Sequence, residues 1–234
     1  MTALDPDALL GTFILEGARV VVLGYAVEAR EHALALRRAG NSVVVIALRD
    51  TPAWAKARGD GFEVDHSGSA ISTADVIVVR AHEDTPLWRQ CEERIAGGAL
   101  VVFASARALH SGRCARSGMD VVLVTNIDVA HVGCRLAVHR DVSRRALLRA
   151  VAYARAAYGA DVPMRSTSVG DEAELEHADI RERSAKLLAL TVQAPAIAAE
   201  KAPKHAWDAD EEAEPADLGD AQWFHAMMNR RGTP

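Results

Sequence analysis

The sequence predicts an α/β fold, in which a doubly wound parallel sheet is followed by a short C-terminal helical extension. Short runs of β-branched and apolar residues recur along the first half of the chain, and helical stretches lie between them. Runs that are apolar on both faces are typical of buried parallel strands. Because strands and helices alternate, the helices should cover both faces of the sheet.

The first of these runs, at 19–24, reads RVVVLG, and residues 27–39 follow it with helical spacing up to Gly40. Four more runs of the same kind predict strands at 42–48, 75–79, 99–103 and 120–124. Three further segments have helical spacing, at 85–96, at 143–158 before Gly159, and at 171–192.

Composition excludes several classes of protein. The chain has 234 residues, 50% of them hydrophobic, and a net charge of −5, so it can bury a core and offers no basic stripe for nucleic acid. It has no apolar run long enough to cross a membrane, and its first residues lack the features of a signal peptide. Cys91, Cys114 and Cys134 show neither metal-ligand spacing nor an obvious pairing, which indicates reduced thiols and a cytoplasmic protein.

The C-terminal part differs in composition. Residues 193–220 are rich in Ala, Pro and acidic side chains, which predicts a solvated linker. The following AQWFHAMMNRR places an aromatic residue and a Met four apart twice, so a short helix would present them on one face and could dock on its own domain, a neighbouring subunit or another protein. The expected organisation is a domain at 1–165, a helix at 166–192 and an acidic tail with a short terminal helix at 193–234.

The turn after the first strand is where a doubly wound sheet would bind a ligand. A dinucleotide site of Rossmann type usually carries G-x-G-x-x-G here. Gly24 matches the first glycine, and Tyr25, Ala26, Val27 and Glu28 follow it. The methyl of Ala26 would point toward a bound pyrophosphate, and Glu28 adds a negative charge at a helix N-terminus that favours anions. We therefore expect these five residues at a nucleotide site whose affinity for NADP is weakened.

The end of the second strand favours NADP. Arg49 with the nearby hydroxyl of Thr51 would suit a 2′-phosphate. Asp50 leaves NAD open, because an acid at this place usually binds the ribose. Arg49 could equally be an ordinary surface residue at a strand end.

Several ordered motifs then resemble the cofactor domain of ketol-acid reductoisomerase, from about residue 5 to 165. GYAVEAREHALALRRAG is similar to that family's GYGSQGHAHALNL pattern, and LRDTPAWAKARGDGFEV contains its WAKA segment. ALVVFASARALHS, DVVLVTNIDVAH and LAVHRDVSRRALLRAVAYARAAYG resemble its later elements. The resemblance implies a Rossmann-type fold and NADP(H). The resemblance also implies that family's chemistry, which uses two magnesium ions. Its enzymes catalyse an alkyl migration in acetolactate-like acids and then reduce the ketone.

The resemblance also indicates what differs. The family's His in F-A-H-G falls on Ser105, and the Lys in A-P-K-G falls on Ile127, whereas His131 is retained. The family's metal-binding Asp and Glu fall near Glu176 and Ile180, and Ile180 cannot bind a metal. The chain is also too short for the family's helical second domain. We therefore expect no magnesium pair, no other metal and no isomeroreductase centre.

Other polar residues remain as candidates for chemistry. We take Ser105, His131 and Cys134 as candidate catalytic residues, because a Cys beside a His can act as a nucleophile or a metal ligand if their loop is helical. A half-buried cysteine without a role is the alternative. One face of the predicted helix at 171–192 carries three acidic residues, Glu172, Glu176 and Asp179. They suggest either a cation site or a solvated surface.

Together these features predict a divergent NADP(H)-binding oxidoreductase or isomerase that acts on a small acid in specialised metabolism. The alternative is a non-catalytic pseudoenzyme that binds a small-molecule ligand or a protein partner. A pocket for another nucleotide or a phosphorylated metabolite is a third hypothesis. A homodimer would use residues 171–192 and the C-terminal tail.

Overall fold

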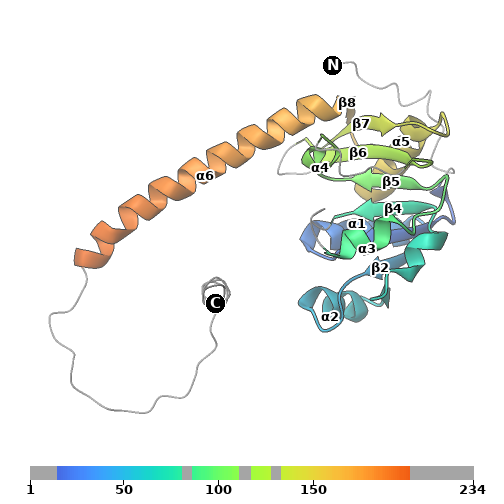
Figure 1. Ribbon diagram of the computed structural model, residues 1–234, viewed down its shortest axis with the longest axis horizontal. Coiled ribbons are helices and arrows are strands. Elements are labelled where there is room, and N and C mark those ends of the chain that lie inside the picture. Colours follow the sequence, from blue (N-terminus) through green and yellow to red (C-terminus); the bar gives the residue numbers. More distant parts are fainter. Residues whose placement is uncertain (1–14, 81–85, 111–116, 128–132, 201–234) are drawn as a thin grey trace, which may run out of the picture. The chain divides into compact units, whose positions relative to one another are not determined.

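The computed structural model describes residues 15–80, 86–110, 117–127 and 133–200 (Figure 1). The chain divides into two units after Ser184. The first contains the sheet, and the second begins at Ala185 within the last described helix. The domain boundaries expected at 165 and 192 stay predictions. No helix in the described ranges has the length and apolar character needed to cross a bilayer.

One sheet organises the first unit, and its strand order is β3-β2-β1-β4-β5-β6-β7-β8 (Figure 1). The order 3-2-1-4-5-6 is that of a Rossmann fold, with the switch point between β1 and β4. The strands are β1 Arg19–Leu23, β2 Ser42–Ile46, β3 Glu63–Asp65, β4 Val76–Val79, β5 Leu100–Phe103, β6 Asp120–Asn126, β7 Cys134–Arg140 and β8 Met164–Ser166.

The five strands expected from the sequence are confirmed as β1, β2, β4, β5 and β6, which run parallel. The expected doubly wound parallel sheet is confirmed over these five strands. At its far end β7 is antiparallel to β6, and β8 is parallel to β7. The connection at 127–133 is too short for a parallel crossover, which takes about a dozen residues. The chain therefore turns back beside β6.

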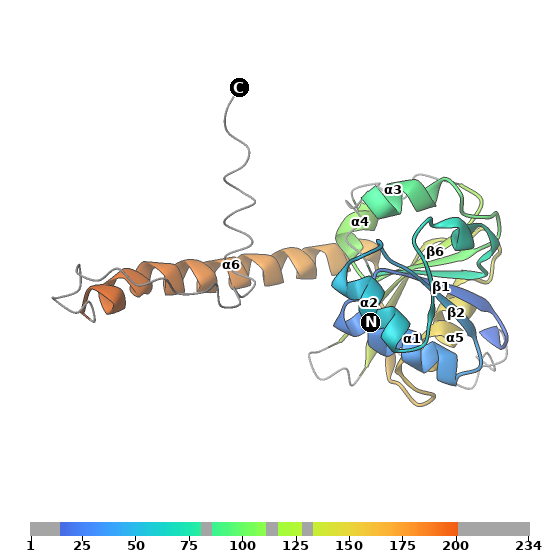
Figure 2. The same cartoon turned by 90° about the horizontal axis from the view of Figure 1, so that it is seen from below.

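Helices cover both faces of the sheet, with α1 and α5 on one face and α3 and α4 on the other (Figure 2). The helix expected at 171–192 is longer, and the one expected at 85–96 is shorter. The helices are α1 Val27–Arg38, α2 Pro52–Gly59, α3 Pro86–Glu92, α4 Ala106–His110, α5 Ala146–Tyr158 and α6 Val169–Glu200.

The core consists of two layers, one on each side of the sheet. Alternate residues of one strand enter different layers: Val20 and Val22 of β1 pack with α1 and α5, whereas Val21 and Leu23 pack on the side of α3. This alternation follows from the two-residue period of a strand. It explains why these strands read as continuous apolar runs.

The amino-terminal edge of the sheet is held by the buried carboxylate of Asp120, which is 1% exposed. It accepts hydrogen bonds from the backbone N–H groups of Val142 and Ser143, both at 2.9 Å, and from the Ser143 hydroxyl at 2.6 Å. The guanidinium of Arg149 lies 2.8 Å away. Burial opposes ionisation, but these donors hold the pKa of Asp120 below its usual value.

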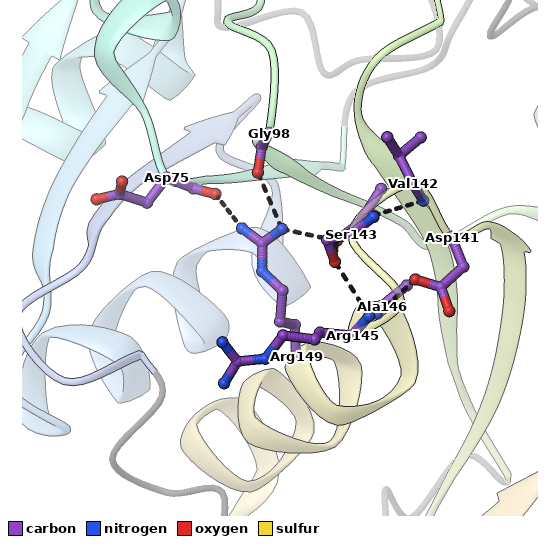
Figure 3. Close-up of polar contacts among 9 residues, drawn as sticks. Asp75, Gly98, Asp141, Val142, Ser143, Arg145, Ala146 and Arg149 are labelled. Atoms are coloured by element: carbon purple, nitrogen blue, oxygen red, sulfur yellow. Dashed lines mark hydrogen bonds and ion pairs between the residues drawn. The ribbon is translucent and has the colours of Figure 1, made fainter.

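Arg149 also connects neighbouring strands at this edge. Its two terminal nitrogens donate to the carbonyl oxygens of Gly98 and Asp75, each at 3.0 Å (Figure 3). Asp75 in turn accepts a hydrogen bond from the backbone N–H of Arg19 at 2.9 Å. One arginine from α5 thus bridges segments that begin three different strands.

The same network sets the start of α5, which begins at Ala146 and not at residue 143. The Ser143 hydroxyl accepts from the Arg145 N–H at 3.1 Å, and Asp141 accepts from the Ala146 N–H at 3.0 Å (Figure 3). Arg144 has a φ of 58°, which is outside the helical range. These contacts form a turn that precedes the helix.

Candidate functional site

A cavity of about 610 Å³ lies at the carboxyl ends of the strands. In a doubly wound sheet this edge, near the switch point, is where ligands bind. The cavity is lined from α1, the ends of β4, β5 and β6, the start of β7, and α6, by Glu28, Arg80, Ala104, Thr125, Asn126, Ile127, Arg135, Glu172, Leu175, Glu176, Asp179 and Arg183.

The turn between β1 and α1 borders this edge. Gly24 has a φ of 87°, a left-handed conformation that favours glycine, and its N–H donates to the Ile46 carbonyl at 3.0 Å. Ala26 is the N-cap of α1, and no side chain in the described part of the chain caps this end. Val27 is 75% exposed. The first N–H groups of α1 therefore lie at a surface, where a helix N-terminus attracts anions.

Tyr25, expected at the ligand, instead points its side chain into the protein, where it is 4% exposed. Its hydroxyl donates to Asp60 at 3.0 Å, and its ring meets Phe62 edge-on at 5.8 Å between centroids. Arg30 binds the same carboxylate at 2.6 Å, and this hydrogen bond is the main cause that lowers the pKa of Asp60 to about 2. Only the backbone of Tyr25 is left to border the turn.

Glu28 forms an ion pair with Arg80, 3.0 Å from Oε2 to Nη1. Arg80 follows β4 and its side chain is 6% exposed, whereas that of Glu28 is 55% exposed. The other terminal nitrogen of Arg80 lies 3.2 Å from the Tyr158 hydroxyl and 3.1 Å from the ring of His32. Sequence reasoning missed Arg80, although a charged residue directly after the apolar run DVIVV was the available signal.

The end of β2 carries Arg49, which is exposed. The Thr51 hydroxyl donates to the Leu48 carbonyl at 2.7 Å and accepts from the Trp54 N–H at 3.2 Å, so it is the N-cap of α2. With Pro52 at the first helical position, this cap explains a helix that the sequence analysis did not predict. Thr51 therefore has a structural role beside any role toward a ligand.

Of the candidate catalytic residues, Ser105 lies next to the cavity. Its hydroxyl donates to Glu176 at 3.0 Å, and the same carboxylate accepts from the backbone N–H groups of Ala106 at 2.6 Å and Arg107 at 3.2 Å. The carboxylate of Glu176 on α6 thus accepts hydrogen bonds from the residues at the start of α4.

Cys134 does not have the environment of a nucleophile. It is the first residue of β7 and is 0% exposed, and burial raises the pKa of its thiol to about 12. It lies in a strand, so the helical pairing with His131 does not extend to it. His131 itself lies outside the described residues.

The acidic residues of α6 share one face, as expected, and all three line the cavity. Glu172 is 2% exposed and forms an ion pair with Arg135 at 2.7 Å. It also accepts a hydrogen bond from the Thr125 hydroxyl at 3.0 Å. Asp179 pairs with Arg183 at 3.1 Å. In the described ranges no group of three His, Cys, Asp or Glu residues is placed to hold a metal ion.

The comparisons with known proteins agree with this geometry. Residues 14–162 match the family model described as the NADPH-binding domain of acetohydroxy acid isomeroreductase. A ketol-acid reductoisomerase (NADP(+)) of Pyrobaculum calidifontis is 30% identical over 187 residues, which cover 74% of this chain and 56% of the relative. The chain thus spans little more than half the length of that relative.

Solved structures show the same fold. The NADH-preferring ketol-acid reductoisomerase from an uncultured archean superposes with a TM-score of 0.66 at 22% identity, covering 75% of this chain and 59% of that one. A semialdehyde dehydrogenase NAD-binding protein from Cupriavidus necator, in complex with calcium and NAD, has a TM-score of 0.60 at 14% identity, covering 80% and 76%. The family match over most of the described sheet confirms the resemblance seen in the motifs, and this chain belongs to the family of the NADPH-binding domain of acetohydroxy acid isomeroreductase.

Proposed function

We propose that this chain binds NADP(H) at the carboxyl edge of its sheet and acts as a divergent oxidoreductase or isomerase on a small acid. The observation that carries the proposal is the match of residues 14–162 to an NADPH-binding domain. It is supported by the cavity at the carboxyl ends of the strands, which is the edge where doubly wound sheets bind their ligands. A nicotinamide cofactor would supply a hydride there.

The residues at the turn fit a dinucleotide in part. Gly24 allows the tight turn, the N–H groups at the start of α1 would face the pyrophosphate, and exposed Arg49 would bind a 2′-phosphate. Ala26 and Glu28 oppose tight binding, through a methyl group and a negative charge. The expected affinity is therefore weaker than that of a site with the full glycine fingerprint.

Arg80 and Arg135 line the cavity and would bind a small anionic substrate once it displaces their carboxylate partners, Glu28 and Glu172. Ser105 is the best supported of the candidate catalytic residues, since its hydroxyl bonds to a residue that lines the cavity. His131 stays a prediction. Cys134 is less well supported because its thiol is buried.

The binding test is a fluorescence titration of the purified chain with NADPH, together with its thermal stability at millimolar NADPH. Arg49→Gln should weaken NADPH binding about tenfold, as expected for the loss of one charge-assisted contact, and should leave NADH binding unchanged. Arg38→Gln is the matched control, because it removes an exposed arginine at the opposite end of α1. Absence of both fluorescence enhancement and stabilisation would exclude the NADP(H) proposal, since binding to the folded state must stabilise it.

A second candidate is a non-catalytic relative that binds a ligand or a protein partner. It is supported by the polar groups around the cavity that are already bonded to one another, notably Ser105 with Glu176 and Arg135 with Glu172. We expect no turnover of acetolactate with NADPH and magnesium in either case. Turnover by the pure chain would show that an isomeroreductase centre is present.

The proposed homodimer through residues 171–192 and the tail has a separate test. Light scattering should show a dimer for the full chain and a change of mass or partner capture after deletion of residues 215–234. An unchanged oligomeric state and unchanged capture would count against both the dimer and a partner-binding tail.

A further inference from the structure

A buried arginine faces the cavity from the end of β4. The Arg80 side chain is 6% exposed and lines the cavity together with Glu28. Its terminal nitrogen Nη2 lies 3.2 Å from the Tyr158 hydroxyl and 3.1 Å from the His32 ring, and these contacts fix its position. Because these groups come from α5 and α1, the guanidinium is held in place before any ligand arrives.

Glu28, the partner of Arg80 on the cavity side, is exposed where Arg80 is buried. Glu28 is 55% exposed and lies in the first turn of α1. A half-exposed carboxylate can turn into solvent at small cost, whereas a guanidinium that is buried among aromatic rings cannot. The anionic member of the pair is therefore the exchangeable one.

The position of the pair relates it to the ligand edge. The Glu28 carboxylate meets Arg80 beside the N-terminus of α1, where no described side chain caps the helix. A ligand anion at this place would gain both the helix N–H groups and the guanidinium, provided that Glu28 moves away. Glu28 occupies the position that such an anion would take.

We propose that Arg80 is the anion-binding residue of this cavity and that Glu28 is an internal competitor, bound to Arg80 until a ligand anion displaces it. The inference rests on the proposed function, because it assumes that the cavity takes an anionic ligand. The anion could be the pyrophosphate of a dinucleotide or the carboxylate of a small acid, and both have the same chemistry toward a guanidinium.

The test uses Glu28→Gln in the full chain, which removes the charge and keeps the size of the side chain. Gln is also the residue that the family pattern GYGSQG carries at this position. Isothermal titration calorimetry would compare three probes: NADPH, inorganic pyrophosphate and 2-oxobutanoate. We expect the Kd of the ligand that uses Arg80 to fall about tenfold, the effect of one freed charge-assisted contact.

Glu31→Gln is the matched control, because Glu31 is an exposed acid of the same helix. It makes the same change of net charge and should leave each Kd within about twofold of the wild type. In an Arg80→Gln background the gain from Glu28→Gln should disappear. If Arg80→Gln does not fold, the comparison of the two glutamate variants still decides.

The probes separate the outcomes. A gain with NADPH and pyrophosphate assigns the anion to the dinucleotide, and a gain with 2-oxobutanoate alone assigns it to a carboxylate substrate. Equal affinity of wild type, Glu28→Gln and Glu31→Gln for every probe that binds overturns the inference, and NADPH binding that persists in all three leaves the proposed function standing. A gain for pyrophosphate in a protein that binds no NADPH supports the inference and refutes the proposed cofactor, and no binding of any probe refutes both.

Discussion

Replacing Arg149 by Met tests the network at the amino-terminal edge of the sheet. The substitution keeps an unbranched apolar stem on α5 but removes the cation that lies 2.8 Å from Asp120, together with two hydrogen bonds to backbone carbonyls. The side chains of the pair are 15% and 1% exposed. Removing one partner from a buried ion pair costs about 3–5 kcal/mol, because the other charge stays buried. We expect a loss near 3 kcal/mol, since Asp120 keeps its donors from Val142 and Ser143.

Urea denaturation followed by circular dichroism measures this loss. Arg183→Met is the control, because its ion pair with Asp179 has side chains that are 76% and 64% exposed, and such pairs contribute less than about 1 kcal/mol. If Arg149→Met and Arg183→Met destabilise the fold equally, the buried network does not have the role assigned to it.

The carboxylate of Asp120 also determines how the free energy of unfolding changes with pH. Because the pKa of Asp120 is lowered in the folded state, its contribution is fully present above the unfolded pKa of about 4 and is lost as the pH falls through the lower folded pKa. The free energy of unfolding of the wild type should therefore fall steeply below about pH 4. Asp120→Asn, if it folds, should show a shallower fall, and an identical slope would contradict this assignment.

Three further measurements follow from the buried contacts. Carboxyl NMR should find the pKa of Asp60 at about 2 and should find it nearer its usual value in Arg30→Gln, since the hydrogen bond from Arg30 is its main cause; an unmoved pKa would contradict that cause. In a Cys114→Ser variant, Cys134 should not react with a thiol reagent until the protein unfolds, because it is buried and its pKa is raised to about 12; rapid reaction in the folded state would show an accessible thiol. Tyr153→Phe should lower the free energy of unfolding by about 1 kcal/mol, because it removes the 2.6 Å contact between the Tyr153 hydroxyl and Nδ1 of His32. A neutral effect in urea denaturation would show that this contact is energetically unimportant.

The strands predicted from the sequence were those with a continuous apolar signal. β3 and β8 were missed because EVD and MRS are short and polar at their exposed positions. β7 reads CRLAVHR and alternates only in part, and its direction depends on pairing with β6, which no local pattern reports. The strands without a continuous apolar run were therefore the ones that sequence reasoning could not find.

At the candidate site, the sequence predicted the turn from Gly24 to Glu28 but not the direction of each side chain. Tyr25 faces inward because Asp60 and Phe62, far along the chain, receive it. Arg80 lies where the end of β4 meets α1 and α5, which supply His32 and Tyr158. Such convergence depends on tertiary structure, so residue spacing alone could not reveal it.

The reversed direction of β7 has an electrostatic consequence. Helices that connect parallel strands bring their positive N-terminal ends to the ligand edge, as α1 does. Because β7 runs the other way, α5 starts near Asp120 and finishes with Tyr158 beside Arg80. The partial negative charge at the last turn of α5 thus favours a cation at Arg80, and the partial positive charge of α1 faces the same place. The negative pole of α5 thus stabilises the cation, while the positive pole of α1 attracts an incoming anion to the same edge.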